Sequence, residues 1–243
     1  MDKSFNEIVQ HIFTQQRELY SSKFNNISLS LKSLIDFNPC FAEKIIEDIE
    51  NLKVIENQLS EEGIFENPRI KLIDIPEILK VKIRDLRTHH VGKLIFVKGK
   101  IVTISTRGLE VESITYECPN CGTLASIDQL GEKVREPDFC FICKFRTSRI
   151  RGFNILRKSM IDAQDIEVRD LQQKEEFGLF QPVRVILKED LCDTEFDPLI
   201  RDGREIEIIG TAREIPRHIK KGDSVYLELV IVANNIFPSM ISK

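Results

Sequence analysis

Apolar residues in the first quarter of the chain recur every three or four positions. Two such runs are Phe5, Ile8, Val9, Ile12, Phe13 and Leu19, and then Phe41, Ala42, Ile45, Ile46, Ile49 and Leu52. This spacing places each run on one face of an α-helix. The pattern therefore predicts a helical bundle over residues 1–66, which ends where Gly63 and Asn67-Pro68 interrupt it.

Beyond Arg69 the apolar residues gather in short runs rich in valine and isoleucine. The clearest runs cover residues 94–104, 183–187, 205–210 and 225–232. Gly99 lies inside the first run, and a glycine within a strand often marks a bulge or a sharp bend. About five strands with few helices between them suit a small closed barrel of the OB-fold type. We expect an α+β protein, with a helical bundle followed by a five-stranded OB-fold barrel.

Four cysteines interrupt the strand pattern in two CxxC pairs, Cys118 with Cys121 and Cys140 with Cys143. Each pair turns tightly, and four thiolates form the tetrahedral set that Zn²⁺ prefers. We expect one structural zinc ion with no open coordination position, and Gly122 suits the first turn. The alternatives are four unrelated cysteines or a redox CxxC pair. Cys40 and Cys192 are isolated, and we expect both to be free thiols.

These patterns divide the chain into three parts. Residues 1–66 form the expected helical subdomain, and residues 67–113 together with 153–238 form the expected OB-fold. Residues 114–152 form a zinc ribbon inserted in that fold, since strand patterns lie on both sides of the cysteines.

A basic segment lies between the last two strand runs and carries Arg213, Arg217, His218, Lys220 and Lys221. Gly222-Asp223 is a turn signal, and Pro216 cannot lie in a central strand, so we expect a projecting β-hairpin. The hairpin would contact nucleic-acid phosphates, and a solvated basic loop is the alternative. Other basic residues on or beside strands could extend this surface: Lys98, Lys100, Arg107, Arg184 and Arg204.

Composition narrows the classes of protein that fit. The net charge of −4 does not suit a protein that coats nucleic acid generally. The charge is uneven: residues 1–77 hold 14 Asp and Glu against 8 Lys and Arg, so any nucleic-acid contact is expected in the rest of the chain. The chain has no tryptophan and 7% aromatic residues, so DNA binding would depend on charge more than on stacking. No apolar run is long enough to span a membrane, and the N-terminus does not resemble a signal peptide. Six cysteines without a secretion signal suggest a reducing compartment, and we expect a cytoplasmic protein.

The sequence contains no GxxxxGK[ST] phosphate loop, no HExxH and no GxSxG motif. We therefore expect no catalysis from this chain alone.

Four segments in order resemble the minichromosome maintenance (MCM) family. Residues 84–102 are similar to the family's "LR…hhGKhhhVxGhV" segment, and residues 116–122 to the start of its zinc ribbon. Asp162, Gln164 and Val168 fit the "D-x-Q-x-h-x-h" strand that follows the ribbon, and residues 183–193 resemble "hxVxLxxDLhD". The chain departs from the pattern in places: Asp170 stands where the family has glutamate, Asp202-Gly203-Arg204 replaces Pro-Gly-Asp, and the loop near Gln172–Pro182 lacks the usual Pro-Arg step.

The resemblance implies the non-catalytic collar of a replicative DNA helicase. In that family the region assembles a hexamer or double hexamer, holds single- or double-stranded DNA in a channel with basic hairpins, and precedes an ATPase domain. The full-length proteins are ATP-dependent helicases. The single-copy form suggests an archaeal, nucleoid-associated protein. The alternatives are a free-standing zinc-ribbon OB-fold module that binds single-stranded DNA without a motor, and a protein-interaction scaffold. Measuring particle size distinguishes rings from small modules.

Overall fold

The computed structural model describes residues 26–63, 65, 68–129, 134–148, 151–171, 182–216 and 227–239. The apolar run from Phe5 to Leu19 lies outside the described residues. So do four residues of the expected hairpin: Arg217, His218, Lys220 and Lys221.

In the first part of the structure, three short helices follow one another along the chain between two strands. The elements are β1 (Asn26–Ser30), α2 (Leu31–Phe37), α3 (Pro39–Glu47), α4 (Asn51–Glu61) and β2 (Arg69–Ile73). Ser30 caps α2 by accepting the Ser33 N–H at 3.3 Å, and Asn38 caps α3 by accepting the Phe41 N–H at 3.1 Å. We call β1, α2, α3, α4 and β2 the helical unit.

The segment before α2 is a strand, although a helix was expected throughout residues 1–66. β1 pairs in parallel with β2, and Ile27 and Leu29 are buried while their neighbours are half-buried. This alternation has the two-residue period of a strand. β2 was expected to open the barrel, but it pairs with β1 in a separate two-stranded sheet.

A seven-stranded sheet forms the rest of the fold, in the order β3-β8-β9-β7-β6-β4-β5. All neighbouring strands are antiparallel except β7 and β9. The strands are β3 (Leu94–Ile104), β4 (Gly108–Glu117), β5 (Leu124–Asp128), β6 (Asn154–Asp170), β7 (Val183–Lys188), β8 (Glu205–Pro216) and β9 (Leu227–Pro238). Short 3-10 turns lie at Glu77–Leu79, Ile83–Asp85, Thr88–His90, Glu189–Cys192 and Thr194–Phe196.

The sheet curls because β3 changes partner along its length. Its first part pairs with β8, and from Gly99 onward it also pairs with β6. A Cβ atom on Gly99 would lie 2.4 Å from Val168 Cγ1 and 2.6 Å from the Arg169 carbonyl oxygen, so only glycine permits this approach. The curled sheet encloses a core that includes Val97, Ile101, Ile166, Val185 and Ile208. Together with the helices it confirms the expected mixed class with an OB-like sheet.

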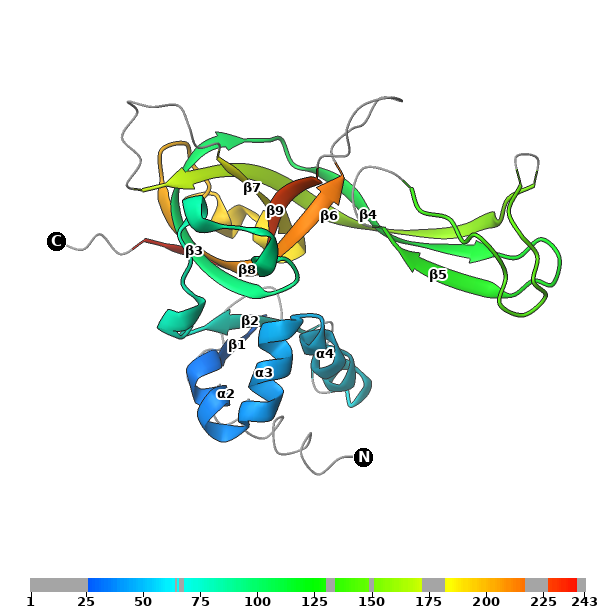
Figure 1. The fold of residues 1–243 in the computed structure, drawn as a ribbon, viewed down its shortest axis with the longest axis horizontal. Coiled ribbons are helices and arrows are strands. Elements are labelled where there is room, and N and C mark those ends of the chain that lie inside the picture. The colour runs from blue at the N-terminus through cyan, green and yellow to red at the C-terminus, as the bar shows by residue number, and fades with distance from the viewer. Residues whose placement is uncertain are drawn as a thin grey trace.

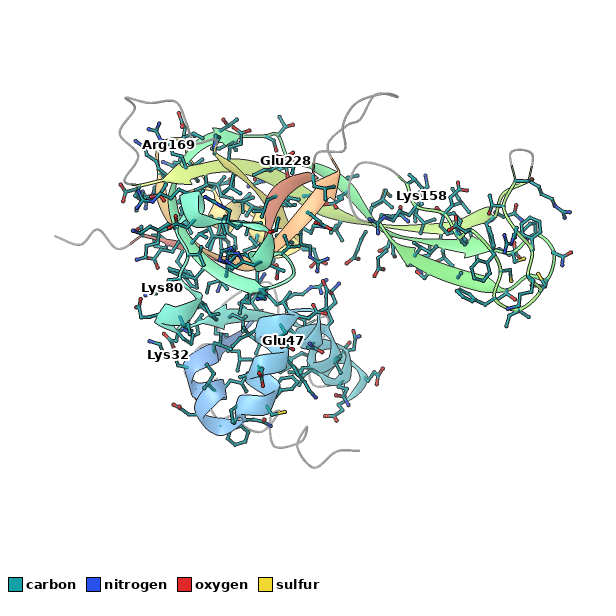
Figure 2. The ribbon with its side chains drawn as sticks, viewed as in Figure 1. Lys32, Glu47, Lys80, Lys158, Arg169 and Glu228 are labelled. Atoms are coloured by element: carbon teal, nitrogen blue, oxygen red, sulfur yellow. The ribbon has the colours of Figure 1, made fainter. Side chains whose placement is uncertain are left out.

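β4 and β6 continue beyond the curled sheet as a two-stranded arm, and β5 adds a third strand at its edge (Figure 1). β6 runs through both parts: Figure 2 shows Lys158 on the arm and Arg169 at the opposite end of the same strand. The cysteine segment lies at the outer end of the arm.

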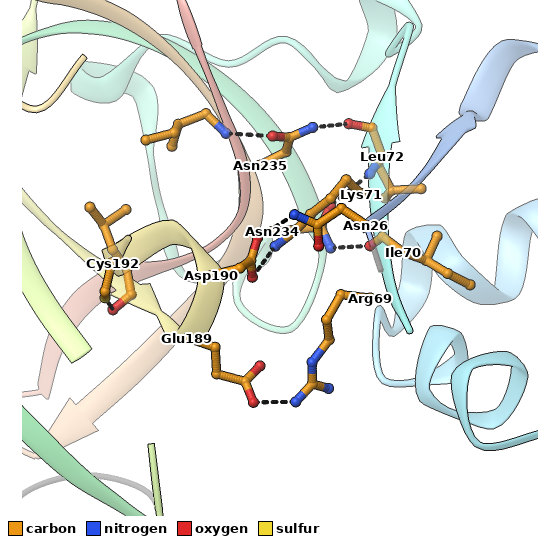
Figure 3. Close-up of polar contacts among 12 residues, drawn as sticks. Asn26, Arg69, Ile70, Lys71, Leu72, Glu189, Asp190, Cys192, Asn234 and Asn235 are labelled. Carbon is orange, nitrogen blue, oxygen red and sulfur yellow. Dashed lines mark hydrogen bonds and ion pairs between the residues drawn. The ribbon is translucent and has the colours of Figure 1, made fainter. Parts of the chain in front are cut away.

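Polar side chains join the helical unit to the sheet (Figure 3). Asn234 of β9 accepts the Leu72 N–H at 2.8 Å and donates to the Ile70 carbonyl at 2.9 Å, as a neighbouring strand would. Lys71 pairs with buried Asp190 at 2.8 Å, and Arg69 pairs with Glu189. None of the helices in the described ranges is both long and apolar enough to cross a membrane.

Candidate metal centre and nucleic-acid interface

The four paired cysteines converge at the outer end of the arm. All four Sγ atoms lie within 4.8 Å of one another. The Sγ atoms of Cys118 and Cys143 are 3.6 Å apart, and so are those of Cys121 and Cys140. A tetrahedron of thiolates about 2.3 Å from one zinc ion has sulfur–sulfur edges of about 3.8 Å. The donor set and its spacing therefore fit a tetrahedral ion held by four sulfurs.

The two CxxC turns share one backbone arrangement. The Gly122 N–H donates to the Cys118 carbonyl and the Lys144 N–H to the Cys140 carbonyl, both at 2.9 Å. Gly122 and Lys144 both adopt left-handed backbone angles, with φ of 72° and 59°. The expectation that Gly122 suits the turn agrees with this geometry. The second turn has the same shape with a lysine in the glycine's place.

A small core of its own supports the cysteines. Tyr116 is fully buried, and its hydroxyl donates to the Arg135 carbonyl at 2.8 Å. Phe145 and Phe153 meet edge to face, with ring centroids 5.7 Å apart. Cys118 and Cys140 belong to the same buried cluster. The ligands are thus held by packing that is separate from the core of the curled sheet.

The surroundings of Cys118 and Cys143 shift the pKa values of these two thiols in opposite directions. Desolvation raises the pKa of Cys118 to about 11, whereas a hydrogen bond from the Asn120 side chain lowers the pKa of Cys143 to about 6. Four adjacent thiolates require a compensating positive charge. A divalent cation is the group that this donor set would hold.

The predicted DNA-binding residues that the structure describes are mostly engaged in ion pairs within the chain. Arg184 pairs with Asp165 at 2.6 Å and Lys98 with Glu207 at 2.5 Å. Arg107 pairs with Asp197, which ties the β3–β4 turn to the end of the Thr194–Phe196 turn. Lys100 is half-buried on β3, and Arg204 is exposed.

Arg213 of β8 pairs with Glu50 of the helical unit at 2.7 Å. Burial would raise the pKa of the Glu50 carboxyl, but Lys53 and Arg213 outweigh it and hold that pKa below its usual value. Arg213 therefore joins two parts of the fold, and a phosphate would have to compete with Glu50 for it.

The second CxxC turn also presents two apolar side chains that the sequence reasoning did not consider. Phe141 and Ile142 lie between the paired cysteines and are 73% and 72% exposed. The signal was present in the motif itself, because Cys140-Phe-Ile-Cys143 places two large apolar residues where the first turn has proline and asparagine.

A family model for the MCM OB domain matches residues 82–216. The chain belongs to the MCM family. It corresponds to the N-terminal part of MCM proteins, as its sequence resemblance indicated.

Two relatives agree with this assignment. One is a protein of Arabidopsis thaliana described as "Probable DNA helicase MCM8", 31% identical over 131 residues, which are 51% of this chain and 16% of that protein. The chain thus spans about a sixth of that relative. The other is a crystal structure of the N-terminal domain of an archaeal MCM, with a TM-score of 0.65 and 20% identity over 98% of this chain and 94% of that one. At this identity the second likeness shows the fold.

Proposed function

We propose that the chain is the DNA-binding, ring-forming N-terminal part of an MCM-type replicative helicase, followed in the whole protein by an ATPase domain. The observation that carries the proposal is the family match over residues 82–216, which covers the cysteine cluster and every strand of the OB-like sheet except β9. The ring would be a hexamer or a double hexamer. With an archaeal origin, the protein would work at the nucleoid in the cytoplasm.

The proposed domains are the helical subdomain, the OB-fold and the zinc ribbon, with the limits expected from the sequence except that β2 belongs with the helical subdomain because it pairs with β1. Five strands would make the OB barrel, in the order β3, β8, β9, β7 and β6. Each of these strands pairs with the next, and β6 pairs with β3, which supports a barrel. Cys118, Cys121, Cys140 and Cys143 would hold one structural Zn²⁺, which leaves no position for a reacting ligand.

The proposed DNA contacts are the basic residues between β8 and β9 and those on the barrel. Pro216 at the end of β8 lies opposite Leu227 at the start of β9, which supports a hairpin between them. The proposed contact residues are Arg213, Arg217, His218, Lys220, Lys221, Lys98, Lys100, Arg107 and Arg184. Arg107 and Arg184 would bind phosphate by giving up their present partners, Asp197 and Asp165. Added salt would oppose this replacement of a carboxylate by a DNA phosphate.

Two measurements test this proposal. Light scattering should give particles of six or more chains, whereas a small module without a motor would remain a monomer or dimer. Titration with single- and double-stranded DNA at two salt concentrations should show affinity that falls steeply with salt.

The hairpin can be tested separately by replacing Lys220 and Lys221 together with Ala. Binding should weaken about equally for all DNA sequences, and the salt dependence should become less steep by about two phosphate contacts. The matched control replaces Lys32 and Lys44, two exposed lysines of the helical unit, and should bind as the parent does. Unchanged binding by the hairpin variant across the salt series would show that the barrel residues bind DNA instead.

A further inference from the structure

A cationic segment precedes β3, and no site described above includes it. Residues 82–93 carry six basic side chains and a single carboxylate, Asp85. All of the basic side chains except half-buried His90 are exposed: Lys82, Arg84, Arg87, His89 and Lys93. We call residues 82–93 the cationic segment.

Carboxylates do not compensate these charges, as they do elsewhere on the sheet. Lys98 pairs with Glu207 and Arg184 with Asp165. Among the residues that the structure describes, no ion pair joins a basic side chain of the cationic segment to an acid. The segment therefore presents positive charge that an anionic partner could neutralise.

The charges of the segment are gathered around His90. Burial lowers the pKa of this imidazole, and the neighbouring His89, Lys93 and Arg87 lower it further. The ring centroids of His89 and His90 are 3.9 Å apart. The basic side chains thus form one patch.

The core of the curled sheet holds this patch in place. Ile83 and Leu86 are buried in that core. Arg87 Nη1 donates to the Arg84 and Leu86 carbonyls at 2.8 and 2.7 Å, and a bridge to β8 follows near the end of the segment. A fixed backbone presents the charges, so little conformational freedom would be lost when a partner binds.

The helical unit carries the opposite charge. Its exposed carboxylates include Glu43 and Glu47 of α3 and Asp48 just beyond the helix, of which Lys32 and Lys44 offset only a part. Glu43 and Glu47 are four positions apart and share one face of α3, on which Figure 2 shows Glu47. No ion pair involves either glutamate in the described part of the chain. Like charges at this spacing destabilise a helix slightly, and an outside cation would relieve them.

The two patches complement each other, but within one chain no ion pair of the described residues joins them. They can meet when two copies of the chain come together. A contact between two different surfaces is head-to-tail, and head-to-tail contacts close into a ring when their rotation allows it. The charge complementarity therefore favours a second copy of this chain as the partner.

We propose that the cationic segment of one chain contacts the Glu43 and Glu47 face of α3 on the next chain of the ring. The inference rests on the proposed function, because it names the surfaces through which neighbouring chains join. Complementary charges of this kind set the register of an interface and speed association. Salt screens exposed charges, so assembly should weaken as ionic strength rises.

Charge reversal on either side tests the contact, with assembly followed by light scattering of nucleic-acid-free protein over a dilution series. Arg84→Glu with Lys93→Glu reverses the cationic segment, and Glu43→Lys with Glu47→Lys reverses the face of α3. Each variant alone should need about tenfold or more protein to assemble, because like charges then meet. An equal mixture of the two variants should assemble as the parent does, because each reversed surface meets an opposite charge on the other variant.

The control makes the same change of charge on the arm, Arg157→Glu with Lys158→Glu, at two exposed positions, and should assemble as the parent does. Circular dichroism checks that each variant is folded. If a reversal prevents folding, Arg84→Gln with Lys93→Gln gives the answer, and it should raise the protein concentration needed by about threefold.

The outcomes separate this inference from the proposed function. Assembly of both reversed variants at the parent's concentration would overturn the inference alone, as would a mixture that does not recover. A parent that stays a monomer or dimer would instead overturn the proposed ring, and the inference with it.

Discussion

The left-handed residue that ends each CxxC turn is the smallest feature on which the metal centre depends. Gly122 takes this conformation without steric conflict, whereas Lys144 takes it with a Cβ atom. A non-glycine residue in the left-handed region is less favourable by about 1 kcal/mol. A Cβ atom on Gly122 would meet only Glu117 Oε1, at 4.0 Å, so crowding plays no part in the difference.

Exchanging the residue types at these turns should change stability in opposite directions. Gly122→Ala should lower the free energy of unfolding of the metal-loaded arm by about 1 kcal/mol, and Lys144→Gly should raise it by up to about 1 kcal/mol. Thermal melting of the metal-loaded protein, followed by chelator competition, measures both. Gly108→Ala is the control, since Gly108 has an ordinary backbone angle and open space around it. Effects of the same sign at both turns would contradict the explanation.

The sequence predicts the site residues whose partners lie only a few positions away along the chain. The cysteines of each pair are three positions apart, so the motif is visible in the chain. The partners of the arginines were not visible, because Arg184 lies 19 residues from Asp165, Arg107 lies 90 from Asp197, and Arg213 lies 163 from Glu50. Which cations are available to DNA depends on these distant contacts.

Among the secondary-structure elements, the strand Asn26–Ser30 is one that the hydrophobic pattern did not predict. It is five residues long and leads directly into α2, so its alternation is too brief to stand out against the helical runs. Its partner β2 follows only after three helices, which form the crossover that a parallel pair needs. The longer runs of β3, β8 and β9 were predictable because valine and isoleucine fill them.

The arm should lose its structure independently of the sheet when its metal is removed. Cys121→Ser should abolish metal binding and expose residues 114–148 to proteolysis, because the arm's small core is organised around the ligands. The curled sheet, with a core of its own, should stay folded. Metal analysis together with limited proteolysis checks this. Cys40→Ser, at an exposed position outside the cluster, should change neither measurement, and full metal content in Cys121→Ser would disprove the ligand set.

At the scale of the whole molecule, the helical unit and the sheet share a core. Leu94, Phe96 and Ile209 of the sheet pack in one buried cluster with the helices. The asparagine and ion-pair contacts of Figure 3 lie beside this cluster. We therefore expect these two parts to unfold together, and the arm to unfold separately.

The buried carboxyl of Glu56 makes the stability of the helical unit and the sheet depend on pH. Burial raises the pKa of its carboxyl, although the Ile70 N–H and Arg69 favour the charged form. The folded pKa is above the unfolded one, so the stability that Glu56 contributes is present at acidic pH and lost as pH rises through the folded pKa. Glu56→Gln cannot ionise and still offers an acceptor to Ile70. Its free energy of unfolding relative to the parent should therefore increase as pH rises above the usual glutamate pKa.

Urea unfolding at a series of pH values measures this difference. Glu61→Gln is the matched control, because Glu61 is exposed on the same helix. If the difference in free energy of unfolding between Glu56→Gln and the parent does not change with pH, burial of this carboxyl does not determine the pH dependence of stability.

The length of β6 has a mechanical consequence. It is a single strand of 17 residues, or about 55 Å, paired with β4 in the arm and with β3 and β7 in the sheet. No loop interrupts it between the arm and Gln164. Its ladder with β4 runs from Asn154 at the cysteine end to Ala163, where the ladder with β7 begins. A displacement of the cysteine end would therefore be transmitted along continuous backbone hydrogen bonding to the β3–β4 turn that Ser105 anchors.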